Sequence, residues 1–213
     1  FQNTIVPAIP VFDTLSVDAN NNASMGWYKD TSPDAVAYVI YQFNGTAWIP
    51  IDTVFGANNT SYTYLLSNAD LASEQYRLAA FDSCGNISPL GAVLRTIHLT
   101  STPLICDRTV NLSWTAYPSL GNGLAGYRIY QSMVSAAGPY TMLGSVSSTT
   151  TTFSATGLAA STTYYYKIEA FDVSGSKTVS SNRINFYSAI PIPPLFSYLR
   201  KVSVVDHNRV DIT

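Results

Sequence analysis

The chain has 213 residues, of which 46% are hydrophobic and 11% charged, and its net charge is −2 with a pI near 5.5. Because Lys and Arg are scattered singly, the sequence offers no basic surface for nucleic acid. No segment reaches the roughly 20 apolar residues of a membrane-spanning helix, so this segment is not expected to insert into a membrane. Fifteen Tyr and nine Phe favour β-sheet, where aromatic side chains pack well.

The first 99 residues are predicted to form short antiparallel strands separated by turns. Strands are expected in SMGW, which ends at Trp27, in AYVIYQ (37–42) and in YRLAAFD (76–82). In AYVIYQ every second side chain points to the same face of a strand. Clusters such as DANNN and GANN mark turns between the strands.

The next residues repeat these phrases. NLSW ends at Trp114, GYRIYQ occupies 126–131, and EAFDVSGS occupies 169–176, so the second copy follows the first by about 90 residues. A unit of this length with several short strands predicts a seven-stranded antiparallel β-sandwich. We therefore expect an all-β chain with a first domain over 1–99 and a second over 100–191.

The last residues are expected to open a third unit. RKVSVVDHNRVDIT (200–213) is typical of a strand, a polar turn and the start of a second strand, and VDIT matches the VNLS that precedes Trp114. The sequence thus predicts that 192–213 are the opening strands of a truncated third domain. The prolines of AIPIPP (189–194) and the absence of a flexible Gly or Ser stretch in AVLRTIHLTSTPLI (92–105) predict a semi-rigid rod.

The second copy resembles fibronectin type III domains. LAASTTYYYKIEA (158–170) is similar to that family's phrase Leu-x-Pro-x-Thr-x-Tyr-x-x-x-Val-x-Ala, with Ala160 in place of proline. The resemblance implies a buried core signature made of Trp27, Tyr38, Trp114, Tyr127, Leu158 and Tyr164. Glu74 stands at the tyrosine-corner position of the first copy, which predicts that this copy lacks the corner hydrogen bond.

A narrower resemblance rests on the combination of DSCGN, a following NLSWTAY and the GYRIY strand. This combination resembles tandem type III repeats of large secreted surface proteins of Bacteroidetes, including those with gliding-motility-associated C-terminal segments. It implies an exported, extracellular or cell-surface protein.

Catalytic groups are sparse. His98 and His207 fall in different predicted units, and no HExxH, GxSxG or phosphate-binding Gly loop accompanies them. Asp82 and Asp172 recur in the FD phrase, but one Asp followed by Ser and Gly supplies too few oxygens for calcium, so an Asx-turn is the expected role. Neither an enzyme nor a cofactor is expected.

Cys84 and Cys106 are the only thiols, and two cysteines in a β-protein with few charges suggest one disulfide. Geometry opposes this pairing. A strand of about ten residues spans roughly 33 Å, whereas a disulfide tolerates Cα separations up to about 7 Å. Free buried thiols and pairing with another module therefore remain open alternatives.

Two functions are compatible with these features. The leading hypothesis is a non-catalytic extracellular spacer or stalk within a larger protein, whose partners are further domains of the same chain. The alternative is an adhesive module that recognises an unknown glycan or protein through loops at its N-terminal tip. The expected tip residues are Tyr28, Asp30, Asp82 and Asn86. Trp48 and the tyrosines would stack on sugars in that case.

Overall fold

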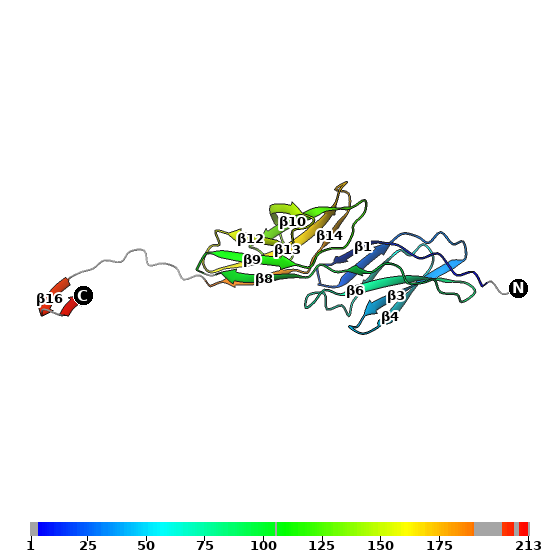
Figure 1. Ribbon diagram of the computed structural model, residues 1–213, viewed down its shortest axis with the longest axis horizontal. Helices are drawn as coiled ribbons and strands as arrows, with labels where there is room; N and C mark the ends of the chain where they lie inside the picture. Colours follow the sequence, from blue (N-terminus) through cyan, green and yellow to red (C-terminus); the bar gives the residue numbers. More distant parts are fainter. Residues whose placement is uncertain (1–3, 105, 190–201, 207–208, 213) are drawn as a thin grey trace.

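The computed structural model describes residues 4–104, 106–189, 202–206 and 209–212, and every regular element among them is a β-strand (Figure 1). None of these residues belongs to a helix with the length and apolar character that crossing a membrane requires. The prediction of an all-β chain is confirmed.

The first sandwich consists of two antiparallel sheets. Its strands are β1 (Phe12–Val17), β2 (Ala23–Trp27), β3 (Ala35–Phe43), β4 (Trp48–Phe55), β5 (Ser61–Tyr64), β6 (Gln75–Asp82) and β7 (Leu94–Arg95). One sheet has the order β1-β2-β5 and the other the order β4-β3-β6-β7. Side chains alternate between the two faces of each strand, so every second one faces the other sheet. Tyr38 and Ile40 on β3 and Leu78 on β6 point into the space between the sheets and are fully buried.

The second sandwich repeats this arrangement. Its strands are β8 (Leu99–Leu104), β9 (Thr109–Trp114), β10 (Leu124–Ser132), β11 (Thr141–Ser147), β12 (Thr152–Thr156), β13 (Thr162–Asp172), β14 (Thr178–Ser180) and β15 (Ile184–Ser188). The sheets are β12-β9-β8 and β11-β10-β13-β14, and β15 also pairs with β13. The last strand is thus divided into two segments. β8 begins at Leu99, the last residue of the predicted first domain.

Two further strands, β16 (Val202–Asp206) and β17 (Arg209–Ile212), pair antiparallel. They coincide with the two strands predicted in the terminal segment. Whether they open a third sandwich stays a prediction, and His207 lies outside the described residues.

The six residues of the core signature are all buried. In the first sandwich the rings of Trp27 and Tyr38 lie 5.3 Å apart at 63°. In the second, Trp114 and Tyr127 lie 5.5 Å apart at 64°, so the two copies share one edge-to-face aromatic pair.

The tyrosine corner differs between the copies. In the second sandwich the hydroxyl of Tyr164 accepts a hydrogen bond from the backbone N–H of Ala159 at 2.8 Å. The first sandwich has Glu74 in place of the corner tyrosine, and a carboxylate oxygen of Glu74 accepts the backbone N–H of Asn68 at 2.9 Å. An ionised carboxylate is a hydrogen-bond acceptor, as the phenol oxygen is, so Glu74 provides the acceptor for the loop backbone in the first sandwich.

Candidate functional site: the junction between the two sandwiches

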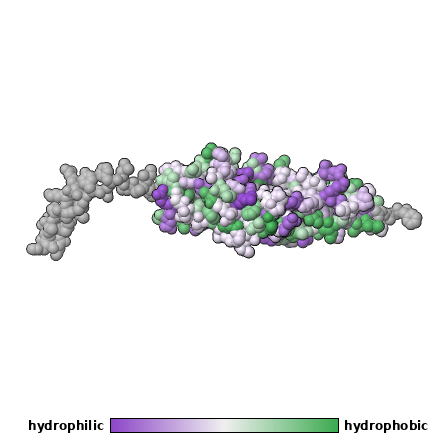
Figure 2. All heavy atoms as spheres, turned by 90° about the horizontal axis from the view of Figure 1, so that it is seen from above, coloured by the Kyte–Doolittle hydropathy of each residue, from purple (hydrophilic) through white to green (hydrophobic). Residues whose placement is uncertain are grey.

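The two sandwiches follow one another along the long axis of the molecule (Figure 1), and Figure 2 shows hydrophilic and hydrophobic residues interspersed over this elongated body from above. Only Thr96, Ile97 and His98 separate β7 from β8, and the side chains of Thr96 and Ile97 are fully buried. Thr115 of the second sandwich forms two hydrogen bonds with this connection. Its hydroxyl donates to the carbonyl of Thr96 at 3.1 Å and accepts the backbone N–H of His98 at 2.9 Å. The absence of a flexible stretch thus corresponds to a short connection held by hydrogen bonds.

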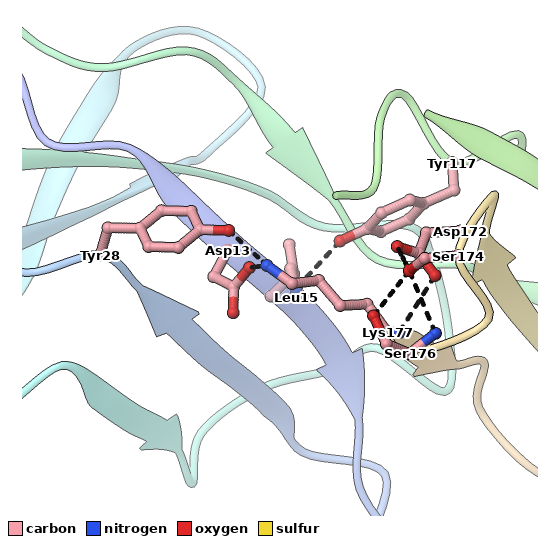
Figure 3. Close-up of polar contacts among 8 residues, drawn as sticks. All are labelled: Asp13, Leu15, Tyr28, Tyr117, Asp172, Ser174, Ser176 and Lys177. Atoms are coloured by element: carbon pink, nitrogen blue, oxygen red, sulfur yellow. Dashed lines mark hydrogen bonds and ion pairs between the residues drawn. The ribbon is translucent and has the colours of Figure 1, made fainter. Parts of the chain in front are cut away.

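Tyr117 carries a hydrogen bond from one sandwich to the other. Its hydroxyl accepts the backbone N–H of Leu15 on β1 at 2.9 Å (Figure 3). Its own backbone N–H donates to the hydroxyl of Tyr127 at 2.8 Å. Tyr117, Tyr127 and Leu15 are all buried. Burial, with a smaller contribution from the charge of Asp13, raises the pKa of Tyr117, so the hydroxyl stays protonated.

Lys177 forms a second contact across the junction. Its ammonium group donates to the carboxylate of Asp13 on β1 and to the hydroxyl of Tyr28, and it also lies 4.7 Å from the centre of the Tyr28 ring (Figure 3). The hydrogen bond to Asp13, followed by that to Tyr28, raises the pKa of Lys177. The side chains of Lys177 and Asp13 remain 26% and 31% exposed, so water screens this ion pair.

β14 and the residues after it lie along β1. The backbone N–H of Ser180 donates to the hydroxyl of Ser16 at 2.8 Å. Further along, Arg183 donates to the carbonyl of Asp18 and, through its backbone N–H, to the side chain of Asn21 at 3.2 Å. The junction therefore runs along an edge strand rather than across two loop tips. Covering β1 in this way also removes an open sheet edge.

Asp172 fixes the turn that presents Lys177. It accepts the hydroxyl of Ser174 at 2.6 Å and the backbone N–H of Lys177 at 3.1 Å, and it is buried (Figure 3). These hydrogen bonds, first that from Ser174, lower the pKa of Asp172. In the neighbouring loop Gly121 has φ of +52°, and a Cβ there would lie 2.8 Å from an oxygen of Asp172. Glycine thus lets the loop pack directly against the turn.

Asp82 has the same role in the first sandwich. It accepts the backbone N–H groups of Cys84 and Asn86 at 2.9 and 2.8 Å, and the Asn86 side chain at 2.8 Å. Burial pushes the pKa of Asp82 upward, but these hydrogen bonds, first that from Asn86, lower it by more, and the net pKa lies below its ordinary value. Asp82 therefore forms the Asx-turn that the sequence predicts, and Asp172 holds the corresponding turn through the Ser174 hydroxyl and the Lys177 N–H.

The structure disperses the expected binding tip. Tyr28 is 51% exposed but turns toward Lys177 of the second sandwich. Asp30 is buried and accepts the backbone N–H of Ser32 at 2.6 Å, and Asp82 is buried in its turn. Asn86 binds Asp82. A binding role for this set stays a prediction, while the carboxylates already have structural partners.

The two thiols are free and exposed. Cys84 lies in the turn after β6, and Cys106 lies in the turn between β8 and β9. The two thiols thus form no bridge with each other and are not buried, and pairing with another module stays a prediction.

A pocket of about 460 Å³ opens beside the junction. Its walls come from the N-terminal segment around Val11, from Val93 and Leu94 of the first sandwich, and from Pro118 of the second. His98 lies elsewhere, with its Nε2 3.2 Å from the carbonyl of Asp70. Within the described part of the chain, no three His, Cys, Asp or Glu side chains gather where they would hold a metal ion.

Sequence reasoning missed Tyr117 and Lys177. Tyr117 follows Trp114 by three residues, at the position where Asp30 follows Trp27. A tyrosine in place of an aspartate, in a loop next to the domain boundary, was the feature of the sequence that could have indicated a contact at the junction. Lys177 gave none, because its role depends on how the two sandwiches are oriented.

The strand order, the shared Trp and Tyr pairs and the corner at Tyr164 define a tandem array of two β-sandwiches with the fibronectin type III fold. No family model matches the chain.

Three curated proteins are similar to the chain. Exoglucanase B of Cellulomonas fimi is 28% identical over 199 residues, covering 86% of this chain and 17% of that protein. Chitinase A1 of Niallia circulans is 28% identical over 200 residues, covering 88% and 26%. Chitinase Chi52 of Paenibacillus xylanexedens is 39% identical over 88 residues, covering 41% and 14%. The chain thus spans at most 26% of the length of these relatives.

Solved arrays of fibronectin type III domains also match. The FN1–FN3 domains of chicken CNTN1 align with a TM-score of 0.35 and 16% identity, covering 86% of this chain and 64% of that one. The central fibronectin-III array of RIM-binding protein aligns with a TM-score of 0.35 and 13% identity, covering 93% and 76%.

Proposed function

We propose that this chain is a non-catalytic spacer that holds other modules of an exported protein at a fixed separation and orientation. The observation that carries the proposal is the junction, in which β14 lies along β1 and only three residues separate β7 from β8. A spacer transmits orientation only when its modules do not rotate freely. The hydrogen bonds of Tyr117, Ser180 and Arg183 oppose such rotation.

The lengths of the relatives support this role. Exoglucanase B and chitinase A1 contain a region similar to nearly the whole chain, and that region is a minor part of each protein. Their names describe enzymes that act on polysaccharides. We infer that the chain serves within an exported protein of that general kind, outside its catalytic part. The narrower origin in surface proteins of Bacteroidetes rests on the phrasing of DSCGN and NLSWTAY.

Adhesion through the N-terminal tip has less support as an alternative. Asp30 and Asp82 are buried, and Tyr28 contacts the second sandwich. Asn86, the fourth residue of the expected tip, donates its side-chain N–H to Asp82.

Small-angle scattering tests the spacer. The 213-residue chain is compared with a variant that carries four additional Gly and Ser residues between Arg95 and Thr96. We expect a single relative orientation of the two sandwiches to fit the scattering of the natural chain. The variant should require an ensemble of orientations. Equal flexibility in the two proteins would show that the junction does not fix the modules and would refute the spacer.

A further inference from the structure

The outer face of the β4-β3-β6 sheet is unusually apolar. Residues directly opposite one another on paired strands share a face, and the outward-facing positions follow from the register. They are Ala37, Val39, Tyr41 and Phe43 on β3; Trp48, Pro50, Thr53 and Phe55 on β4; and Arg77, Ala79 and Phe81 on β6. The outward face of an antiparallel sheet normally carries polar side chains.

Large side chains cover the middle of this face. Ala37, Val39 and Ala79 are buried, with 0%, 8% and 0% exposure, although they do not belong to the core between the sheets. The aromatic side chains around them provide the cover, and Phe55 is itself 70% exposed. Phe55 thus exposes its ring at one end of the face, and at the other end the rings of Phe43 and Trp48 lie 5.2 Å apart and are half-buried.

The second sandwich provides an internal comparison. Where the first has Val39 opposite Ala79, the second has Arg128 paired with Glu169 at 3.0 Å. Where the first has Phe55, the second has Ser147. The same fold in the same chain thus supports a polar outer face, and its structure does not require the apolar one. The aromatic side chains that remain partly or fully exposed on such a face are available for contact with a ligand.

Arg77 adds a group whose hydrogen bonds are incomplete. Its guanidinium lies 4.8 Å from the centre of the Trp48 ring, and its Nε is buried without a hydrogen-bond partner. Arg128 and Lys177, in contrast, each pair with a carboxylate. A buried unsatisfied donor is costly, and movement of the Arg77 side chain toward an oxygen-bearing ligand would remove part of that cost.

We propose that this outer face binds a polysaccharide chain. Sugar rings have apolar C–H faces that stack on Phe43 and Trp48, and their hydroxyl or carboxylate oxygens accept hydrogen bonds from Arg77. The face measures about 20 Å along the strands and about 10 Å across them. This is well below the roughly 800 Å² per partner of a stable protein interface, but it accommodates an extended chain of sugars.

This site is separate from the junction. The second sandwich contacts the first along β1, in the opposite sheet, so the β4-β3-β6 face stays open when the two sandwiches are docked (Figure 1). The proposal therefore stands or falls independently of the spacer.

Tryptophan fluorescence tests the proposal on the whole chain. Trp27 and Trp114 are only 4% and 6% exposed, so Trp48 is the indole that reports on ligand at this face. Cellohexaose, chitohexaose and an oligogalacturonate serve as probes, two neutral and one acidic. We expect at least one of them to change the emission with a saturable dependence on its concentration.

Variants locate the site and identify the ligand class. Phe43→Ala is expected to weaken binding about tenfold, since stacking and apolar contact are lost. Arg77→Gln is expected to abolish binding of the acidic probe if the natural ligand is a uronic acid polymer, and to weaken the neutral probes about tenfold otherwise. Tyr140→Ala is the matched control, because Tyr140 faces Lys167 at 5.2 Å in the second sandwich, and it should leave binding unchanged.

Three outcomes would overturn the proposal. The first is that no probe changes the fluorescence or binds in calorimetry. The second is that Tyr140→Ala weakens binding as much as Phe43→Ala does. The third is that the chain self-associates in sedimentation and Phe43→Ala disrupts this association, which would assign the face to a second copy of the chain.

Discussion

The hydroxyl of Tyr117 accepts the backbone N–H of Leu15 at 2.9 Å, which joins the second sandwich to an edge strand of the first. The backbone N–H of Tyr117 also donates to the hydroxyl of Tyr127 at 2.8 Å. Tyr117 therefore connects the edge strand to the aromatic pair in the core of the second sandwich. The two cores are thereby linked through a single buried tyrosine. A disturbance at this residue is expected to affect both sandwiches.

Tyr117→Phe is expected to destabilise the chain by about 1 to 3 kcal/mol, since it leaves the buried N–H of Leu15 unsatisfied. It should also separate the unfolding of the two sandwiches into distinct transitions. Denaturation followed by fluorescence measures both effects. Tyr130→Phe is the control, because the hydroxyl of Tyr130 lies 3.4 Å from Glu169 of the same sandwich and does not bond to the first sandwich. A loss of stability no larger than in this control would contradict the assigned role.

The Lys177 and Asp13 pair is expected to contribute little at neutral pH. Both side chains are partly exposed, so a double-mutant cycle with Lys177→Met and Asp13→Asn should give a coupling energy below about 1 kcal/mol. Its contribution should decrease in high salt. A coupling of several kcal/mol that salt does not change would mean that the pair is effectively shielded from solvent.

The pH dependence of this pair follows from the raised pKa of Lys177. A raised pKa means that the folded chain holds the proton more tightly than the unfolded chain does. The contribution is therefore fully present below the ordinary lysine value of 10.5 and is lost as pH rises through the higher pKa of the folded state. Stability curves of the natural chain and Lys177→Met should converge in that alkaline range. Curves that stay parallel up to strongly alkaline pH would contradict it.

The turn at Asp172 is expected to loosen in acid. Its pKa is lowered in the folded chain, so its contribution is present above the ordinary value of 3.8 and is lost as pH falls through the lower folded value. Hydrogen exchange should show reduced protection at Ser174 to Lys177 in Asp172→Ala, and in the natural chain at low pH. Asp107→Ala, at an exposed turn of the same sandwich, should leave protection unchanged.

The repeated phrases of the sequence were sufficient to predict the sandwiches. Trp27 and Tyr38 recur as Trp114 and Tyr127, and such residues fill a core whose geometry depends on strand alternation within each unit. The Asx-turn at Asp82 was predictable for the same reason, since its partners lie within four residues.

The junction could not be predicted in this way. Tyr28 was assigned to a free tip because its loop lies at the end of a strand, yet its hydroxyl contacts Lys177, which lies 149 residues away. Such contacts depend on the rotation of one sandwich against the other, and no periodicity within a strand encodes that rotation. Glu74 shows a related limit, because the family pattern specifies a tyrosine while the loop needs only a hydrogen-bond acceptor.

Glu74 and Tyr164 offer a matched comparison of the two corners. Glu74 accepts hydrogen bonds from the backbone of Asn68, the hydroxyl of Ser67 at 2.6 Å and the hydroxyl of Tyr76 at 2.7 Å. Glu74→Ala should therefore cost about 2 to 4 kcal/mol, as several donors lose a charged acceptor. Tyr164→Phe removes one bond and should cost about 1 to 2 kcal/mol. Chemical denaturation ranks the two variants, and a smaller loss in Glu74→Ala would show that the carboxylate does not replace the corner tyrosine.

The exposed thiols make a final prediction about chemistry at the surface. Because Cys84 and Cys106 are both exposed and free, each should react with a thiol reagent such as 5,5′-dithiobis(2-nitrobenzoate) in the folded chain, without denaturant. Their turns lie on different sandwiches, so mild oxidation should join separate molecules rather than close a bridge within one. Cys84→Ser and Cys106→Ser should each remove one reactive group. A native chain that reacts only after unfolding would show that the thiols are buried, and a disulfide-closed monomer on oxidation would show that the two turns approach each other in solution.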